Sequence, residues 1–237
     1  MRINEKGRSM IEMLGVLAII GVLSVGGIAG YSKAMAKFKA NKTIDLISHT
    51  VANTRILFGS QRNYADLNTD WNANTQKLAV NAKLFLDEAV RSTTSGTGDD
   101  AVTTTSFENA YAGGIALYSG DRLSAGDNKA FILVLTGIPQ SACIDLATQD
   151  WSASSGSGFV AMTIKGDDQT ALDAAATAAR AAISGAGKLL NDCTSTQSGG
   201  ASNGAILCAR DGEPMSTIVA TQGCTGVNFN TMAFKFF

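Results

Sequence analysis

The chain has 237 residues, enough to bury a core, and its 19 basic and 20 acidic side chains give a formal net charge of -1. No basic excess is present to hold nucleic acid, and only 16% of the residues are charged where about 25% is usual. Because His49 is the only histidine in the sequence, a zinc site with several histidines is excluded, and any Ser-His-Asp triad would depend on this one residue. Composition therefore argues against an enzyme, and we expect no metal and no cofactor.

An uncharged run of 20 residues extends from Met13 to Ser32. As a helix it would span about 30 Å, the hydrocarbon thickness of a bilayer, and it is longer than the apolar part of a cleaved signal peptide. Beyond it, apolar residues recur every three or four positions as far as Phe58. The pattern predicts one continuous membrane-inserted helix that ends in an amphipathic half.

Basic residues flank the apolar run on both sides, so the positive-inside rule alone does not orient it. The four cysteines all follow the run, and an even number of cysteines in an exported domain favours disulfides and an oxidising compartment. We therefore expect the N-terminus in the cytoplasm.

Glu12 stands at the N-terminal edge of the apolar run, between Ile11 and Met13. Drawing an ionisable group into hydrocarbon costs at least a few kcal/mol, so a carboxylate here indicates a function or a partner. The alternative is that Glu12 lies in the headgroup region and has no role.

The residues KGRSMIEMLGVLAIIGVLSVGGIAGY resemble the leader and N-terminal helix of type IV prepilins, in which a short basic leader ends in Gly and the fifth mature residue is Glu. In this register Gly7 ends the leader, Arg8 is the first mature residue and Glu12 is the fifth. The resemblance implies that a membrane aspartyl peptidase cuts after Gly7 and methylates the amine of Arg8. It also implies that Glu12 neutralises the amine of a neighbouring subunit, and such pairing among apolar helices would select one axial stagger.

Two positions depart from the family pattern. The first mature residue is usually Phe, Met or Leu where this chain has Arg8, and a common mid-helix proline is absent from the region of Ala29. Gly26, Gly27 and Gly30 surround that position, and each costs roughly 1 kcal/mol in a helix relative to Ala, so we expect a hinge there. A close helix–helix contact through the two glycines of Gly26-x-x-x-Gly30 is the alternative.

Beyond about residue 60, short apolar runs alternate with Ser, Thr, Gly, Asn and Asp, which is typical of an α+β fold. We expect five strands in one antiparallel sheet, at 113–121, 130–138, 159–166, 205–210 and 232–237. Turn-forming residues predict surface loops at 92–106, 152–158 and 194–204.

Two helices are expected in this region. Residues 76–90 place four apolar side chains on one face, those of Leu78, Ala82, Phe85 and Ala89. Residues 172–183 are rich in alanine, with a capping box from Thr170 to Asp173 and Gly185 as a C-cap.

Segments 108–118, 135–146 and 221–237 resemble, less specifically, the globular domain of the larger type IVb major pilins. The resemblance implies a disulfide between Cys143 and Cys224, which leaves Cys193 and Cys208 to pair around a Gly/Ser-rich loop. The number of cysteines by itself allows three different disulfide pairings. No CxxC motif occurs, and the cysteine spacings do not suit zinc.

The other notable polar and aromatic residues are expected to be structural. His49 should be a partly exposed position on the helix, and the Asp pairs at 99–100 and 167–168 should be solvated rather than bound to calcium. Trp71 and Trp151 should be core or subunit-contact residues.

The resemblance implies a type IV pilin fold, α+β, in which a long N-terminal helix packs on an antiparallel sheet. We expect a leader at 1–7, a helix at 8–58 with a membrane and filament-core half (8–32) and an amphipathic half (33–58), and a disulfide-bonded head at 59–237. The implied function is that of a major, IVb-like pilus subunit, first held in the bacterial inner membrane and then polymerised into an extracellular filament.

The implied partners are other copies of the chain, the prepilin peptidase and an inner-membrane assembly platform, with no nucleic acid. A minor pilin or a type II secretion pseudopilin would share the same leader. A membrane-anchored binding domain that never polymerises is an alternative of another class. A secreted enzyme is disfavoured because no nucleophile, base and orienting group can be named together.

Overall fold

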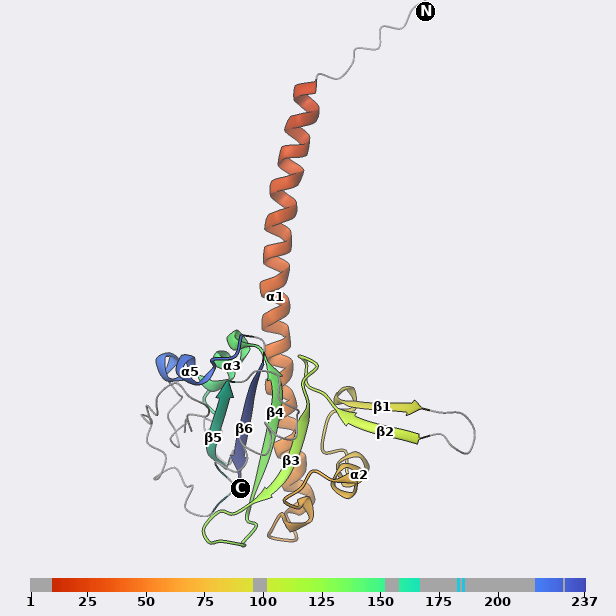
Figure 1. The fold of residues 1–237 in the computed structure, drawn as a ribbon, viewed down its shortest axis with the longest axis vertical. Helices are drawn as coiled ribbons and strands as arrows, with labels where there is room; N and C mark the ends of the chain where they lie inside the picture. Colours follow the sequence, from red (N-terminus) through yellow and green to blue (C-terminus); the bar gives the residue numbers. More distant parts are fainter. Residues whose placement is uncertain are drawn as a thin grey trace, which may run out of the picture. The chain divides into compact units, whose positions relative to one another are not determined.

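The computed structural model describes residues 10–95, 102–151, 158–166, 183, 185, 216–227 and 229–237 (Figure 1). The chain divides into two compact units, Met1–Lys39 and Ala40–Phe237. Helix α1 (Met10–Phe58) has 49 residues and ends at Phe58, as the apolar periodicity predicts. Gly26, Gly27 and Gly30 are helical, so the structure contains no break at the expected hinge.

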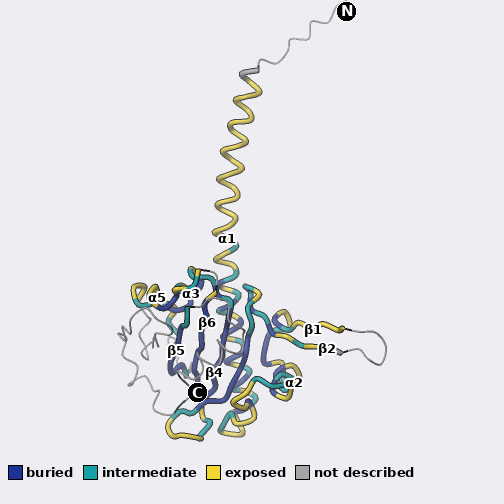
Figure 2. Tube along the Cα trace, viewed as in Figure 1, coloured by how far each residue is buried: buried dark blue, intermediate teal, exposed yellow. Residues whose placement is uncertain are grey.

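The two halves of α1 differ in burial (Figure 2). From Met13 to Tyr31 every large apolar side chain is exposed, at 53% to 75% of its surface. From Ala40 onward one face of the helix is buried, including Ile47 and Phe58, because apolar residues there follow the 3.6-residue helical period. The second half of α1 is therefore part of the head's core.

The core of the head is built on a four-stranded antiparallel sheet with the order β3-β4-β6-β5. Its strands are β3 (Ile115–Gly120), β4 (Ala130–Ile138), β6 (Asn230–Phe236) and β5 (Phe159–Gly166). One row across the sheet pairs Leu117 with Leu133, Leu133 with Phe234, and Phe234 with Met162. Four of the five expected strands are thus confirmed in one sheet, and the fifth, 205–210, lies outside the described residues.

Alternate residues of each strand point to opposite faces of the sheet. Leu117, Leu133 and Phe234 belong to the large core that contains the buried face of α1. Their neighbours Ala116, Ile132 and Ala233 form a smaller buried cluster on the other face, called here the outer face. Both faces are buried, which explains why these strands read as continuous apolar runs.

The prediction of a surface loop at 92–106 is wrong. Strands β1 (Val90–Ser95) and β2 (Val102–Phe107) form a two-stranded antiparallel sheet without a register shift, extending away from the four-stranded sheet (Figure 1). Its threonines are β-branched and favour extended backbone even without a core to cover. At its base, Phe107 is buried and anchors the hairpin to the head.

The bounds predicted for the helix at 76–90 are also wrong, because the observed helix, α2, covers only Ala73–Asn81. The Asn72 side chain caps its start, accepting from the N–H groups of Asn74 and Thr75 at 3.0 and 3.1 Å. Lys83 has a φ of 49° and ends the helical path, so that Phe85 enters the core from an irregular segment.

The remaining described elements are short: η1 (Ala65–Leu67), η2 (Asp87–Ala89), α3 (Gln140–Ala147) and α5 (Thr217–Gly223). Of the helix expected at 172–183, only Ile183 is described, and it is helical and buried. Its capping box and the loops at 152–157 and 194–204 lie outside the described residues, whereas Gly185 is described in a bend.

Candidate functional site

The first half of α1 carries the sequence-predicted assembly residues. Glu12 lies in the first turn of the helix and is exposed, where a negative charge interacts favourably with the helix dipole. The next charged side chain along the helix is Lys33, which lies about 30 Å away at the helical rise. No ion pair to Glu12 forms within the part of the chain that the structure describes.

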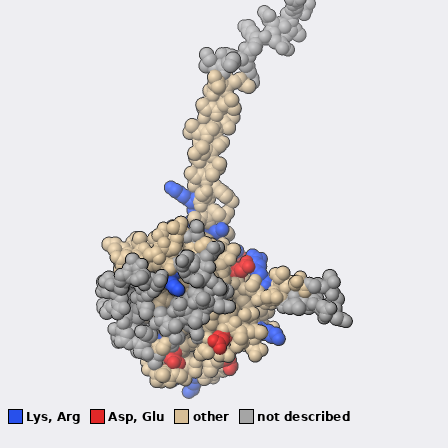
Figure 3. Space-filling model, in the orientation of Figure 1, with Lys and Arg blue, Asp and Glu red and all other residues tan. Residues whose placement is uncertain are grey.

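The two serine hydroxyls in the apolar surface that follows Glu12 are satisfied within the helix. In Figure 3 this part of α1 is tan, with no blue or red side chain on the face in view. The hydroxyls of Ser24 and Ser32 donate to the carbonyls of Ile20 and Ile28 at 2.7 and 3.0 Å, which satisfies them within the helix. This is the one described helix that is long and apolar enough to cross a membrane.

The glycines of this half face open space. A Cβ atom at Gly15, Gly21, Gly26, Gly27 or Gly30 would meet no other atom within 4 Å. Their surface is therefore accessible to another helix, which is the geometry that small residues provide for close helix–helix contacts. Gly7 and Arg8, the expected cleavage and methylation sites, lie outside the described residues.

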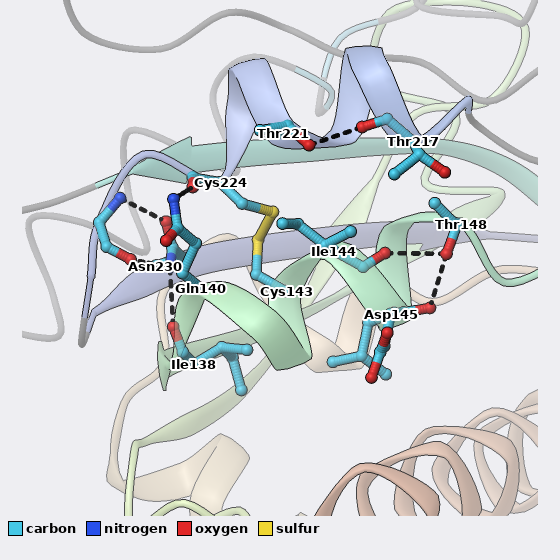
Figure 4. Close-up of a disulfide and its surroundings, with 12 residues drawn as sticks. Ile138, Gln140, Cys143, Ile144, Asp145, Thr148, Thr217, Thr221, Cys224 and Asn230 are labelled. Carbon is cyan, nitrogen blue, oxygen red and sulfur yellow. Dashed lines mark hydrogen bonds between the residues drawn. A yellow bond between two sulfur atoms is a disulfide. The ribbon is translucent and has the colours of Figure 1, made fainter. Parts of the chain in front are cut away.

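A disulfide joins Cys143 to Cys224 across 81 positions of the sequence (Figure 4). Cys143 lies on α3, Cys224 directly follows Gly223 as the C-cap of α5, and both cysteines are fully buried. The structure thus contains the pair that the pilin resemblance implies. Cys193 and Cys208 lie outside the described residues.

Two amide side chains hold the backbone around this disulfide, and sequence reasoning had missed both (Figure 4). Gln140 donates from Nε2 to the carbonyl of Cys224 at 2.9 Å. Asn230 donates from Nδ2 to the carbonyls of Ile138 and Gly226 at 2.9 and 2.7 Å. The disulfide, α3 and the start of β6 therefore form one bonded unit, called here the disulfide clamp.

The turn at 109–114 supports the sheet beside the clamp. Asn109 is buried; its Nδ2 donates to the carbonyl of Thr136 at 2.8 Å, and its Oδ1 accepts from the N–H groups of Tyr111 and Gly113 at 2.8 and 3.2 Å. A Cβ on Gly113 would lie 1.8 Å from the carbonyl oxygen of Thr136. Only glycine fits this approach, which explains the glycine at position 113.

Tyr111 connects this turn to α3. Burial, together with the nearby carboxylate of Asp145 on α3, raises the pKa of Tyr111 to about 12. Tyr111 is partly buried and packs against the large core.

A pocket of about 170 Å³ lies between α1, η2 and the base of the hairpin. Its rim carries two ion pairs, Lys42–Glu88 at 2.9 Å and Arg91–Glu108 at 3.5 Å. It contains no histidine, cysteine or serine, and no group of three potential metal ligands occurs among the described residues. The arrangement provides no nucleophile with a base.

His49, Trp71 and Trp151, which the sequence predicts to be structural residues, all make packing or polar contacts within the head. His49 is partly buried on α1, with Asn53 within 3.4 Å of its ring nitrogens. Trp71 packs against Phe85, Phe107 and Tyr118. Trp151 packs on Phe234 and donates to the carbonyl of Leu146 at 2.9 Å. The Asp pairs at 99–100 and 167–168 lie outside the described residues.

Among solved structures, the chain is similar to TcpA, a type IV pilin from Vibrio cholerae El Tor biotype, with 19% identity and a TM-score of 0.47 over 85% of this chain and 99% of that chain. It is also similar to the type IVb pilin from Salmonella typhi, with 17% identity and a TM-score of 0.41 over 79% of this chain and 93% of that chain. No curated protein matches the chain by sequence.

The family model PilS, described as PilS N terminal, matches residues 37–203, which is more than half of the 237 residues. The matched range includes the buried half of α1, the hairpin and Cys143. The chain therefore belongs to the PilS N-terminal family.

Proposed function

We propose that this chain is a type IVb-like pilin, a structural subunit that is cleaved after Gly7, methylated on Arg8 and polymerised through the first half of α1 into an extracellular filament. The observation that carries the proposal is the continuous apolar surface from Met13 to Tyr31, exposed on every large side chain. Exposed apolar area of this extent is costly in water and requires either lipid or other protein as a partner. In the precursor, the lipid of the inner membrane would cover this surface. In the filament, the helices of neighbouring subunits would cover it.

Glu12 is the residue that distinguishes assembly from passive anchoring. In the filament its carboxylate would pair with the methylated amine of Arg8 on a neighbouring subunit, because a charge buried among apolar helices is tolerated only with a partner. The structure supports this role because Glu12 is exposed in the first turn of α1, where a neighbouring subunit could reach its carboxylate. The open glycine surfaces of the same half support close approach of neighbouring helices.

The partners follow from these steps. The prepilin peptidase would act at Gly7, and an inner-membrane assembly platform would extract the mature chain from the bilayer. The N-terminus would lie in the cytoplasm before processing, with the disulfide clamp on the oxidising side of the membrane. A hinge at Gly26, Gly27 and Gly30 would let the helix, continuous in the isolated chain, stretch within the filament.

N-terminal mass spectrometry of protein sheared from the cell surface tests the processing step. The expected mature chain begins at Arg8 and carries one methyl group on its amine. A surface-exposed chain that begins at Met1 would contradict the proposal. Abundant recovery in sheared filaments is expected for a major subunit, whereas a trace amount would assign it to the minor pilins.

Substitution of Gly7 by valine is expected to block maturation. A peptidase must approach the backbone at the cleavage site closely, and valine adds a branched Cβ that obstructs this approach and restricts φ. The measurement is the ratio of precursor to mature chain on a gel, with Gly15→Val as a control inside the helix. Normal processing of Gly7→Val would overturn the assignment of the cleavage site.

A further inference from the structure

Two exposed lysines and two exposed aromatic residues follow the apolar surface of α1, and together they are called here the collar. The collar consists of Tyr31, Lys33, Lys37 and Phe38. Both lysines are exposed, and the rings of Tyr31 and Phe38 are 65% and 61% exposed. Figure 3 shows blue side chains on α1 beyond its tan apolar part. Aromatic rings and long cationic side chains are the residue types that favour the surface of a membrane.

The collar lies along α1 at the position where a bilayer surface is expected. Lys33 is about 30 Å from Glu12 at the helical rise, which is the thickness of the hydrocarbon layer. Lys37 is one turn further, about 6 Å along the axis, and the headgroup layer of one leaflet has about the same thickness. If Glu12 is at one surface of the hydrocarbon, both ammonium groups therefore lie among the headgroups at the other.

The helix does not compensate the charge of the two lysines. Lys33 and Lys37 are four residues apart, so they share one face of the helix and repel each other. The sequence has no acidic residue between Glu12 and Asp45, so no carboxylate of α1 lies one turn from either lysine. Positive charge on the exported flank of a membrane helix also opposes the positive-inside rule. An anion outside the helix would relieve both costs.

We propose that the collar binds the phosphate groups of anionic phospholipids in the leaflet on the oxidising side of the inner membrane. This inference rests on the membrane-held precursor of the proposed function. Each lysine near an anionic lipid surface favours it by about fivefold. Tyr31 and Phe38 are seven residues apart and share the opposite side of the helix, where their rings lie between headgroups and hydrocarbon. The collar would hold the precursor at one depth before assembly.

Electron paramagnetic resonance of spin-labelled lipids tests this inference on the full-length chain in phosphatidylcholine vesicles. Labelled phosphatidylglycerol or phosphatidylcholine is added from outside and enters the outer leaflet only, and protease digestion identifies preparations whose heads are outside. The cations of the leader then lie at the other leaflet. The quantity is the ratio of the association constants of the two lipids, taken from the fraction of each that the helix immobilises.

We expect phosphatidylglycerol to be preferred by at least about fivefold at an ionic strength of about 0.01 M. The preference should fall below about twofold at about 1 M, because the Debye length is then only about 3 Å. A preference below about twofold at the low ionic strength would overturn the proposal without any variant.

The double substitution Lys33→Gln and Lys37→Gln tests whether these two lysines are the site. It keeps two long polar side chains and removes both charges, so the preference at low ionic strength should fall below about twofold. Lys77→Gln with Lys129→Gln is the matched control, because it removes the same charge from two exposed lysines of the head, and it should retain the preference. A preference that persists in the first double variant, or disappears in the control, would contradict the collar.

The possible results distinguish failure of the collar from failure of the proposed function. A chain that inserts but shows no lipid preference would overturn the collar and leave processing and polymerisation intact. A chain that does not insert would overturn the membrane-held precursor and the collar together. If the variant with Lys33→Gln and Lys37→Gln kept the lipid preference but gave no sheared filaments, the two lysines would bind carboxylates of a neighbouring subunit instead.

Discussion

The two halves of α1 have the same secondary structure and opposite surfaces. The half beyond Ala40 is amphipathic and buries one face in the head, whereas the half from Met13 to Tyr31 is apolar on all sides and buries none. An amphipathic helix can satisfy its apolar face within its own chain. A helix that is apolar all round needs lipid or other molecules, and so the same element serves folding in one half and assembly in the other.

The disulfide clamp offers the largest expected effect on the head alone. Cys224→Ser opens a ring that spans 81 positions, and in the chain-entropy model this costs about 4 kcal/mol of the free energy of unfolding. Urea unfolding of the full chain in detergent, followed by the fluorescence of Trp71 and Trp151, measures the loss. Helicity of the first half of α1, which is outside the clamp, should persist.

If Cys224→Ser left the free energy of unfolding within 1 kcal/mol of the unmodified chain, the clamp would not be what holds α3 to the last strand. Cys143→Ser serves as the matched variant, because it opens the same ring from the other end and should have the same effect.

Two truncations of apolar side chains on α1 should separate its halves. Ile47 is fully buried, so Ile47→Ala should lower the free energy of unfolding of the head by about 3 kcal/mol. Leu17 is 63% exposed, so Leu17→Ala should change it by less than about 0.5 kcal/mol. Urea unfolding in detergent measures both, and equal losses would mean that the two halves are not distinct in folding.

A smaller effect concerns the loop between β3 and β4. Although burial acts in the opposite direction, four backbone N–H groups that donate to its carboxylate lower the pKa of Asp127 to about 2. The resulting stabilisation is present above pH 4 and is lost as the pH falls toward 2. It should amount to about 1 kcal/mol, because solvent screens a charge in a surface loop.

The variant Asp127→Asn should lack this acid-dependent loss. The free energy of unfolding, measured from pH 5 to pH 2, should fall less steeply in Asp127→Asn than in the unmodified chain. Asp70→Asn, a substitution at an exposed carboxylate, should leave the slope unchanged. If all three chains had the same slope, the loop's hydrogen bonds would contribute nothing to stability.

Apolar patterning predicted the core of the fold but not its polar margins. Strands at 130–138 and 159–166 were predicted with the bounds that the structure shows, because a strand buried on both faces is a continuous apolar run between turn residues. The hairpin β1–β2 was missed because its stability comes from threonine's preference for extended backbone and from one anchoring residue, Phe107. The clear signal there was β-branching in 102–105, not hydropathy.

The site shows the same limit. Cys143 and Cys224 were paired through a family resemblance, and Glu12 stood out because a charge beside an apolar run is costly. Gln140 and Asn230 carried no such signal, because an amide that will bond to a distant backbone carbonyl looks like any other polar residue in the sequence. The premature end of α2 depends on the φ of Lys83, which no periodicity encodes.

Assembly through the first half of α1 is tested most directly by the yield of filaments from Glu12→Ala. Removing the carboxylate leaves the amine of a neighbouring subunit unpaired in the filament, at a cost of a few kcal/mol per subunit, while it makes the helix more apolar in the membrane. Asp45→Ala is the matched control, because Asp45 is an exposed acid on the same helix. Arg8→Phe distinguishes the terminal amine from the Arg8 guanidinium as the partner, since assembly should persist if the amine is that partner.

The measurement compares membrane-bound chain with sheared extracellular chain for each variant. We predict that Glu12→Ala is inserted and disulfide-bonded at normal levels but is lost from the sheared fraction, whereas Asp45→Ala is recovered in both. Recovery of Glu12→Ala filaments at the yield of the unmodified chain would contradict the account and leave Glu12 as a residue of the membrane interface alone.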